Sequence, residues 1–355
     1  MAPEGAFKNR ARAGATLEDV AHLAGVSPAT VSRCLNSPSL VRSALKAKVD
    51  AAIRQLDYVP HGGARSLASR RSRMIGAIFP TLDSTLFGGT LEALQQEIGD
   101  AGYTLVVASS SYDAGREQDH VRNLLASGID ALMLVGSSRD ESVYRLIERN
   151  GVPYVLIWIS QAEGQQACVG FDNVAAAAAL TRHLLDIGHR RIGVISGLVR
   201  HNDRAAGRVA GVRQALAERG MTLEEDLVVE RPFGLTEGRE ACRLLMSREL
   251  RPTALVCGSE PFAYGAIFEC QALGLEVPRD VSVAGFDDIW LASELEPGLT
   301  TIRTPQRRMG RHAGRYLLSV LAGEETVPPR PLDFELIVRG TTAPPREAVA
   351  DERPS

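Results

Sequence analysis

The sequence predicts an N-terminal all-α helix-turn-helix domain followed by an α/β core of two doubly wound parallel-sheet lobes. Three observations support this fold class. A glycine turn joins two short amphipathic helical patterns near residue 25, buried-strand patterns alternate with helical ones from residue 74 onward, and that alternation starts again after residue 172. A chain of 355 residues is also too long for one ordinary core, so several domains are expected.

The composition is that of a globular protein, with 45% hydrophobic and 23% charged residues. Residues 1–15 lack the apolar stretch of a secretory signal, and no apolar run approaches the ~20 residues of a membrane span. The five cysteines show no C-x-x-C spacing and no Cys/His cluster. We therefore expect a cytoplasmic protein with no membrane partner, no metal and no cofactor.

The net charge of −3 conceals an uneven distribution of charge. Residues 1–73 contain 12 Lys and Arg against 5 Asp and Glu, a net charge of +7, whereas the remaining residues contain 28 against 38, a net charge of −10. A small basic domain on a larger acidic body is typical of a nucleic-acid reader joined to a separate domain. A basic segment alone can also be a solvated face, so a motif is needed.

Residues 16–38 supply that motif. Apolar positions from Leu17 to Ala24 repeat at helical spacing, and Gly25 then ends the first helix. Ser27 followed by Pro28 is an N-cap with proline at the first helical position, so a second helix begins there. The second helix of such a unit enters the major groove and presents its N-terminal residues to base edges. The alternative is a generic helical hairpin with a solvated arginine.

Pro28, Ala29 and Arg33 are expected to face the bases, and the short polar side chains of this helix suit phosphates. The residues of this unit expected at the DNA are Thr16, Leu17, Ser27, Pro28, Ala29, Thr30, Ser32, Arg33 and Asn36.

The segment D19-VAHLAGVSPATVSRCLN-36 resembles the head of the lactose-repressor family of bacterial transcription factors, and the resemblance continues through residues 58–76. It implies a hinge helix over residues 61–73 in which Arg65 contacts the DNA and Leu67 is wedged into the minor groove, where such wedges bend the duplex. His61 departs from the usual asparagine, and Gly62-Gly63 weakens this helix by roughly 1 kcal/mol per glycine. The hinge is therefore expected to fold on DNA; a plain linker is the alternative.

In the body, apolar strand patterns alternate with helical patterns such as that of Leu91, Leu94 and Ile98. Strands are expected at residues 75–79, 104–108, 131–135 and 155–159, and in a second series at 192–196, 227–230, 254–257 and 281–284. Open parallel sheets bind ligands beyond the carboxyl ends of their strands, so two facing lobes create a ligand cleft.

The body resembles the periplasmic sugar-binding-protein-like core of the same family. The landmarks are V169-GFDN-173, I187-GHRRIGVISG-197, S282-VAGFDDI-289, L299-TTIRTPQRRMG-310 and F334-ELIVRGTT-342. Segments 268–278, 169–173 and 304–310 look most like the branch that includes the gluconate repressors. The resemblance implies that the chain crosses between the lobes near Thr300–Pro305 and again near Pro331.

The resemblance implies an effector site. Arg208 matches the family's ligand-binding arginine, whose planar fork suits a carboxylate or paired hydroxyls, and Asp287 matches an acceptor for ligand hydroxyls. Ser259-Glu260 replaces the usual Asn-Asp, so the recognised hydroxyl pattern stays open. Trp158 is either a ligand wall or ordinary core. The full set of residues expected at the effector is Phe87, Trp158, Arg208, Phe233, Ser259 and Asp287.

Two other functions, an enzyme and a transport component, are compatible with parts of the sequence. No G-x-S-x-G elbow, P-loop or metal-spaced group supports an enzyme, and His183 and His189 are expected to satisfy local backbone at a helix end. A sugar-binding transport component without a regulatory role is the main alternative. We expect instead a regulator that binds double-stranded operator DNA as a homodimer or higher oligomer and responds to a sugar or sugar acid.

The expected domains follow from these patterns. They are an N-terminal extension (1–15), the helix-turn-helix domain (16–60), the hinge (61–73), the two-lobe core (74–342) and a loose tail (343–355). Within the core, the first lobe is expected at about 74–172 and 304–331 and the second at about 173–303 and 332–342.

Overall fold

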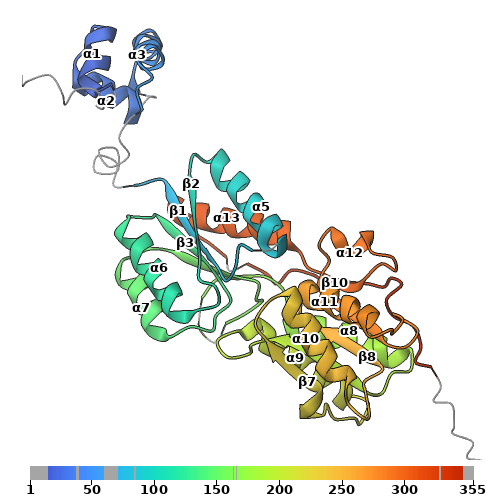
Figure 1. Cartoon of the computed structure of the whole chain (residues 1–355). Coiled ribbons are helices and arrows are strands. Elements are labelled where there is room, and N and C mark those ends of the chain that lie inside the picture. The colour runs from blue at the N-terminus through green and yellow to red at the C-terminus, as the bar shows by residue number, and fades with distance from the viewer. Residues whose placement is uncertain are drawn as a thin grey trace, which may run out of the picture. The chain divides into compact units, whose positions relative to one another are not determined.

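The computed structural model describes residues 15–36, 40–59, 71–83, 85–162, 164, 166–327 and 329–346. The chain divides into two compact units, residues 1–73 and residues 74–355 (Figure 1). Arg65 and Leu67 of the expected hinge, and most of the expected extension and tail, lie outside the described residues.

The N-terminal unit contains helices α1 (Leu17–Ala24), α2 (Pro28–Asn36) and α3 (Ser43–Gln55). Thr16 begins α1 with a capping box, because its side chain accepts a hydrogen bond from the backbone of Asp19 while the Asp19 carboxylate accepts one from the Thr16 backbone. Gly25 ends α1 in the left-handed region, at φ 65°. The helix-turn-helix predicted from this turn is confirmed.

A small core holds the three helices together. It is built from side chains of all three helices and from one tyrosine after α3: Val20, Ala21, Val31, Cys34, Val49, Ala52 and Tyr58. The apolar stripes of the helices meet there, which leaves the opposite face of α2 exposed.

The core unit contains two mainly parallel sheets, which the sequence predicted. The first has the strand order β2-β1-β3-β4-β5, and the second β11-β10-β9-β8-β6-β7, with only the β10–β11 pair antiparallel among the described strands. The first sheet consists of β1 (Met74–Phe79), β2 (Thr104–Ser109), β3 (Ala131–Val135), β4 (Tyr154–Ile157) and β5 (Cys168–Val169). The second consists of β6 (Ile192–Gly197), β7 (Val228–Arg231), β8 (Ala254–Cys257), β9 (Ser282–Asp287), β10 (Thr300–Arg303) and β11 (Glu335–Ile337).

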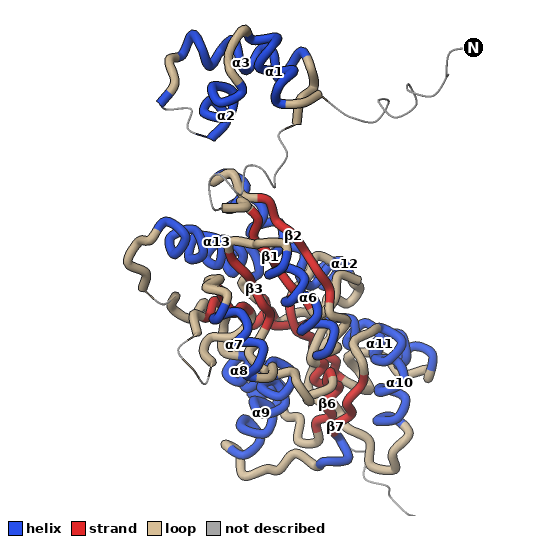
Figure 2. Tube along the Cα trace, turned by 90° about the vertical axis from the view of Figure 1, so that its left-hand side faces the viewer, coloured by secondary structure: helices blue, strands red, loops and turns tan. Residues whose placement is uncertain are grey.

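Helices cover both faces of each sheet (Figure 2). Around the first sheet, α5 (Gly88–Asp100) and α13 (Gln306–Ala322) pack together on one face, and α6 (Ala114–Ala126) and α7 (Glu141–Arg149) contribute to the core on the other. Around the second, α8 (Asn173–Asp186) pairs with α9 (Asp203–Ala217), and α10 (Leu235–Met246) with α11 (Glu260–Ala272). The short elements are η2 (Thr85–Phe87), η3 (Glu225–Leu227) and α12 (Leu291–Glu294).

Three segments carry the chain between the lobes. β5 is followed by α8, which packs beside the second sheet; β10 of the second sheet is followed by α13 of the first lobe; and α13 is followed by β11. The backbone N–H of Leu332 donates to the carbonyl of Gly170 at 2.7 Å, so the first and third crossings lie side by side.

The expected strand 155–159 was too long at its end. β4 stops at Ile157, and Trp158 adopts a positive φ of 68°, which takes it out of strand geometry. The sequence showed an unbroken apolar run there, and periodicity alone does not reveal a residue with a positive φ.

None of the described helices is both long enough and apolar enough to cross a bilayer.

Candidate functional site

The N-terminal end of α2 is exposed, as a base-reading surface requires. Ser27, Pro28, Ala29 and Arg33 are exposed. The Ser27 hydroxyl caps the helix by accepting from the backbone N–H of Thr30 at 3.2 Å. Thr30 and Ser32 are half-buried, whereas Thr16 is exposed and Leu17 half-buried at the start of α1. Because Arg33 is exposed, packing does not prevent its side chain from entering a DNA groove.

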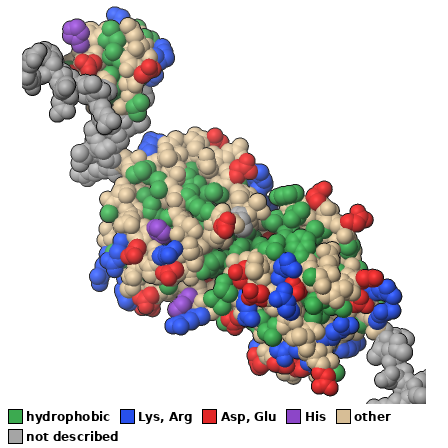
Figure 3. Space-filling model, in the orientation of Figure 1, with side chains coloured by type: hydrophobic (Ala, Val, Ile, Leu, Met, Phe, Trp, Pro, Cys, Tyr) green, Lys and Arg blue, Asp and Glu red, His purple; other side chains and the backbone are tan. Residues whose placement is uncertain are grey.

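A cavity of about 480 Å³ opens between the two lobes of the core unit. Five of the six expected effector residues line it, namely Phe87, Trp158, Arg208, Phe233 and Ser259. Its walls come from the carboxyl ends of strands in both sheets, where open α/β sheets bind ligands. Hydrophobic side chains gather where the lobes meet on the face shown in Figure 3, and charged side chains crowd over the second lobe.

The wall from the first lobe is aromatic. The rings of Phe87 and Trp158 meet edge to face, with centroids 5.1 Å apart, and Phe87 also contacts Phe79 at 5.3 Å. Trp158 is 1% exposed, yet its Nε1–H has no hydrogen-bond partner among the described residues. Trp158 therefore packs as a core residue and also lines the cavity, with a buried donor that no described residue satisfies.

The wall from the second lobe is built around Arg208 on α9. Its Nε donates to Asn173 Oδ1 at 3.0 Å, its Nη1 donates to the carbonyl of Gly258, and its guanidinium lies 3.8 Å from the centroid of the Phe286 ring. These contacts hold the charged group in one position. Burial lowers the pKa of Arg208 from its usual value.

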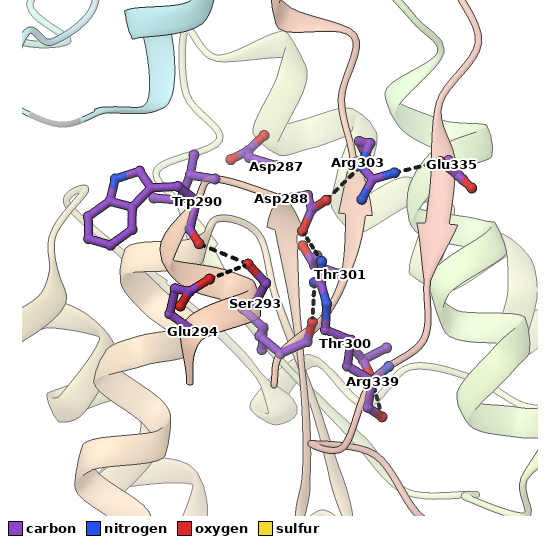
Figure 4. A network of polar contacts seen from close by, with 12 residues as sticks. Asp287, Asp288, Trp290, Ser293, Glu294, Thr300, Thr301, Arg303, Glu335 and Arg339 are labelled. Carbon is purple, nitrogen blue, oxygen red and sulfur yellow. Dashed lines mark hydrogen bonds and ion pairs between the residues drawn. The ribbon is translucent and has the colours of Figure 1, made fainter. Parts of the chain in front are cut away.

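Asp287 does not line the cavity; it lies against Arg208, with Oδ1 3.5 Å from Arg208 Nη2. Neither carboxylate oxygen accepts a hydrogen bond from a described residue, and burial raises the pKa of Asp287 to about 7. In Figure 4 its side chain points away from neighbouring Asp288, which pairs with Arg303 at 2.7 Å. Direct contact between Asp287 and a ligand hydroxyl would thus require Arg208 to move.

The pair at the start of α11 divides its roles. Ser259 lines the cavity, and its buried Oγ has no partner among the described residues. Glu260 turns away from the cavity and accepts hydrogen bonds from Tyr264 Oη at 2.8 Å, Ile289 N at 3.0 Å and Thr301 Oγ1 at 3.2 Å. Burial, together with nearby Asp287, raises the pKa of Glu260 to about 8.

Tyr112 was missed by the sequence analysis. It lines the cavity from the first lobe, and its ring stacks on Phe233 of the second, with centroids 6.0 Å apart. Tyr112 and the preceding Ser111 both have positive φ values, as do Trp158 and His201, which also line the cavity. Strained backbone of this kind clusters at ligand sites.

A polar tie between the lobes was also missed. Asp203, the first residue of α9, accepts hydrogen bonds from the backbone N–H and the hydroxyl of Ser137, the latter at 2.8 Å. It also pairs with Arg204 at 2.8 Å, and Arg204 lines the cavity. Burial raises the pKa of Asp203, but the charge of Arg204 and the hydrogen bonds from Ser137 outweigh burial and hold this pKa below its usual value.

His183 and His189 contact side chains that are distant from them in the sequence. His189 was expected to satisfy local backbone, which is wrong: its ring nitrogens contact Thr253 Oγ1 at 2.8 Å and Ser282 Oγ at 3.1 Å, both distant in sequence. His183 Nε2 lies 3.2 Å from Thr342 Oγ1. Within the described ranges, no group of three or more His, Cys, Asp or Glu side chains is arranged to hold a metal ion.

A helix-turn-helix unit joined to a two-lobe core with a polar cavity between the lobes defines a ligand-responsive DNA-binding regulator. The family model described as bacterial regulatory proteins, lacI family, matches residues 16–61, and the model described as periplasmic binding protein-like domain matches residues 181–342. The chain belongs to the lacI family. The resemblance seen in the sequence is confirmed, and the protein is a transcriptional repressor controlled by a small-molecule effector rather than an enzyme.

Three similar proteins place the chain within that family. The HTH-type transcriptional repressor PurR of Yersinia enterocolitica is 34% identical over 317 residues, which cover 88% of this chain and 92% of the relative. The HTH-type transcriptional regulator GntR of Pseudomonas aeruginosa is 34% identical over 330 residues, 92% and 95% of the two chains. The lac repressor dimer bound to operator and the anti-inducer ONPF superimposes with a TM-score of 0.81 at 27% identity, covering 93% of this chain and 100% of that one.

Proposed function

We propose that the protein binds a palindromic operator as a homodimer and is controlled by a sugar or sugar acid bound between its lobes. The observation that carries the effector class is the cavity wall formed by Arg208, Trp158 and Ser259. A fixed guanidinium and two buried polar groups without partners suit a ligand rich in hydrogen-bond acceptors. Similarity to a GntR regulator supports the same class.

In this proposal Asp287 acts through Arg208. Its carboxylate is close enough to attract the guanidinium but too far for a hydrogen bond, so it biases the position of Arg208 while leaving its donors for a ligand. Phe87 and Phe233 supply the apolar faces of the cavity. A sugar or sugar acid has both kinds of surface, because its C–H groups lie opposite its hydroxyls.

A purine effector is the second candidate, favoured by the similarity to a PurR repressor and by the aromatic pair Tyr112 and Phe233. A purine would depend on ring stacking, whereas a sugar acid would depend on the guanidinium. The two candidates therefore differ in whether the Arg208 guanidinium or the aromatic pair contributes more to the binding free energy.

Regulation is proposed to follow from lobe closure. Effector bound to both walls would favour one arrangement of the lobes, which alters the spacing of the two Met74 ends in the dimer and undocks hinge segments 61–73 from the operator. Arg65 and Leu67 would then leave the DNA, and the protein would act in the cytoplasm at the nucleoid. The proposed domain boundaries are those expected from the sequence, except that the tail is placed after residue 346, because Ala343 bonds to Ser282 and Arg346 pairs with Asp280 of the core.

The operator half of the proposal is tested by footprinting and gel shift with the full-length protein on its upstream DNA. We expect one symmetric protected region, since a two-fold dimer reads a two-fold site, and a steep loss of affinity with salt. Arg33→Ala should relax base preference at one symmetric position, at a cost of about 1–3 kcal/mol. Salt-insensitive binding, or a monomer on DNA, would contradict the proposal.

The effector half is tested by a thermal-shift screen of sugars, sugar acids and nucleobases. A ligand that binds the folded state raises the melting temperature. The same ligand should release the protein from operator fragments in the gel shift.

A further inference from the structure

The second lobe brings two buried arginines to the cavity. Arg204 and Arg208 are four residues apart on α9, so they project from the same face of the helix, one turn apart. Both line the cavity and both are only 9% exposed. A single arginine was expected there from the sequence; the structure provides a pair.

The carboxylates that compensate this pair do not line the cavity. Asp287 lies 3.5 Å from Arg208, and Asp203 pairs with Arg204 at 2.8 Å while it also accepts hydrogen bonds from Ser137. The acidic side chains that do line the cavity, Asp83 and Asp113, are exposed and belong to the first lobe. The inner surface therefore carries two guanidinium groups, and Arg204 adds to burial in lowering the pKa of Arg208.

Arg204 has donors to spare. An arginine has five N–H groups, and to described residues Arg204 donates only from Nη1, to Asp203 Oδ1. Asp203 thus fixes the side chain while most of its fork stays open. A bound anion would relieve the repulsion between the two guanidinium groups and satisfy these donors at once.

Arg204 also sits at the boundary between the lobes. Gly136 of the first lobe has a φ of 74°, and a β-carbon at this position would collide with Arg204 Nη1 and with the Asp203 carboxylate. The guanidinium therefore rests against the loop after β3. An anion held by Arg204 would be bound across this seam, where its binding depends on how the lobes are closed.

We infer, building on the proposed effector site, that Arg204 is a second effector-binding side chain and that Arg204 and Arg208 together bind the carboxylate of a polyhydroxy acid. Asp203 is the positioning residue that orients Arg204 and ties it to Ser137 of the opposite lobe. The effector is then an acid of the aldonate or uronate class, and the neutral sugar with the same hydroxyls is a poor substitute.

The test is isothermal titration calorimetry on the full-length protein with D-gluconate, other aldonates and uronates, and sorbitol, which carries the hydroxyls of gluconate without its carboxylate. Arg204→Gln should weaken binding of the acid by about 10- to 100-fold, as expected for loss of charge-assisted hydrogen bonds. The affinity of Arg204→Lys for the acid should lie between those of the wild type and Arg204→Gln, because lysine keeps the charge but loses the planar pair of donors. Operator binding, measured in parallel, shows that each variant is folded.

Arg219→Gln is the matched control, because Arg219 is an exposed arginine of the same lobe that pairs with Asp186 and does not line the cavity. It should change affinity for the acid by less than about threefold, the range expected for an exposed charge. The wild-type protein should prefer gluconate or another acid strongly over sorbitol, and Arg204→Gln should reduce that preference. A merely structural role for Arg204 would not alter this selectivity.

Two results would overturn the inference, and they are distinguishable. If an acid binds and Arg208→Ala abolishes binding but Arg204→Gln keeps full affinity, Arg204 is not a ligand residue and the proposed effector site still stands. If no acid of the panel binds the wild-type protein, or sorbitol binds equally well, the polyhydroxy-acid class itself is wrong.

Discussion

The two lobes share a topology but differ in what they present to the cavity. The order β2-β1-β3-β4 in the first sheet corresponds to β7-β6-β8-β9 in the second, with helices on both faces of each. The first lobe contributes the aromatic side chains Phe87 and Trp158, whereas the second contributes Arg204 and Arg208. The lobes thus differ in the charge that they present to the cavity, although the second lobe also contributes the rings of Phe233 and Phe262.

This difference shows how one architecture acquires specificity. The strands fix where the loops lie, and the side chains on those loops decide what binds. The aromatic wall excludes water, which strengthens the electrostatic contacts made by the facing arginines. The arginines of the second lobe should therefore dominate affinity for a charged ligand, and the aromatic rings, including Phe233 of the second lobe, should dominate affinity for a flat aromatic one.

The largest expected effect on affinity comes from removing one charged and one aromatic side chain of the cavity in turn, both of them from the second lobe. Arg208→Ala should reduce affinity for a sugar acid about a hundredfold or more, because it removes a buried charge from its partner charge. Phe233→Ala should cost less than about tenfold, since the ring supplies only apolar contact. Titration calorimetry on both variants, each checked for operator binding, measures the ratio.

The reverse order, with Phe233→Ala the more damaging change, would favour the purine effector. Full affinity and full release from DNA in Arg208→Ala would remove the cavity assignment altogether.

Much of this arrangement could be predicted from local patterns. The cap at Ser27, the turn at Gly25 and the alternating strands and helices depend on residues close in sequence, so they were predicted correctly. Resemblance supplied Arg208, because a motif places it. The aromatic character of Trp158 was visible, but its positive φ was not.

What was missed depends on contacts between distant segments. His189 bonds to Thr253 and Ser282 through the register of neighbouring strands, which no local pattern encodes. The Asp203–Ser137 tie exists only because two lobes meet. Ser259 and Glu260 were read as one unit, yet the first helical turn of α11 directs one into the cavity and the other behind it.

The largest expected effect on stability concerns Glu260. This buried side chain lies behind the cavity in the second lobe, so its substitution tests stability and not ligand binding. Its folded-state pKa of about 8 lies above the usual value, so its contribution to stability is fully present at low pH and is lost as pH rises through 8. Glu260→Gln preserves a neutral group that can accept from Tyr264 and Ile289 and donate to Thr301.

We therefore expect Glu260→Gln to be close to the wild type near pH 5 and more stable at pH 9 by several kcal/mol, since each pKa unit between the usual value and 8 corresponds to about 1.4 kcal/mol. Urea denaturation at pH 5, 7 and 9 measures the difference. An advantage that shrinks as pH rises would show that Glu260 is ionised in the folded protein at neutral pH.

The smallest expected effect concerns Ser259, and its sign is more informative than its size. A buried hydroxyl without a partner contributes nothing to the folded state, so Ser259→Ala should leave the free energy of unfolding unchanged or slightly higher. If a ligand satisfies that hydroxyl, effector affinity should fall by about 1 kcal/mol, roughly fivefold.

Ser282→Ala is the matched control in the same lobe, because the Ser282 hydroxyl is buried but bonded to the Ala343 carbonyl at 3.0 Å. That variant should lose about 1 kcal/mol of stability and keep full affinity. Denaturation and calorimetry on the pair should thus give opposite patterns, and equal patterns would show that Ser259 belongs to the framework of the lobe and not to its ligand wall.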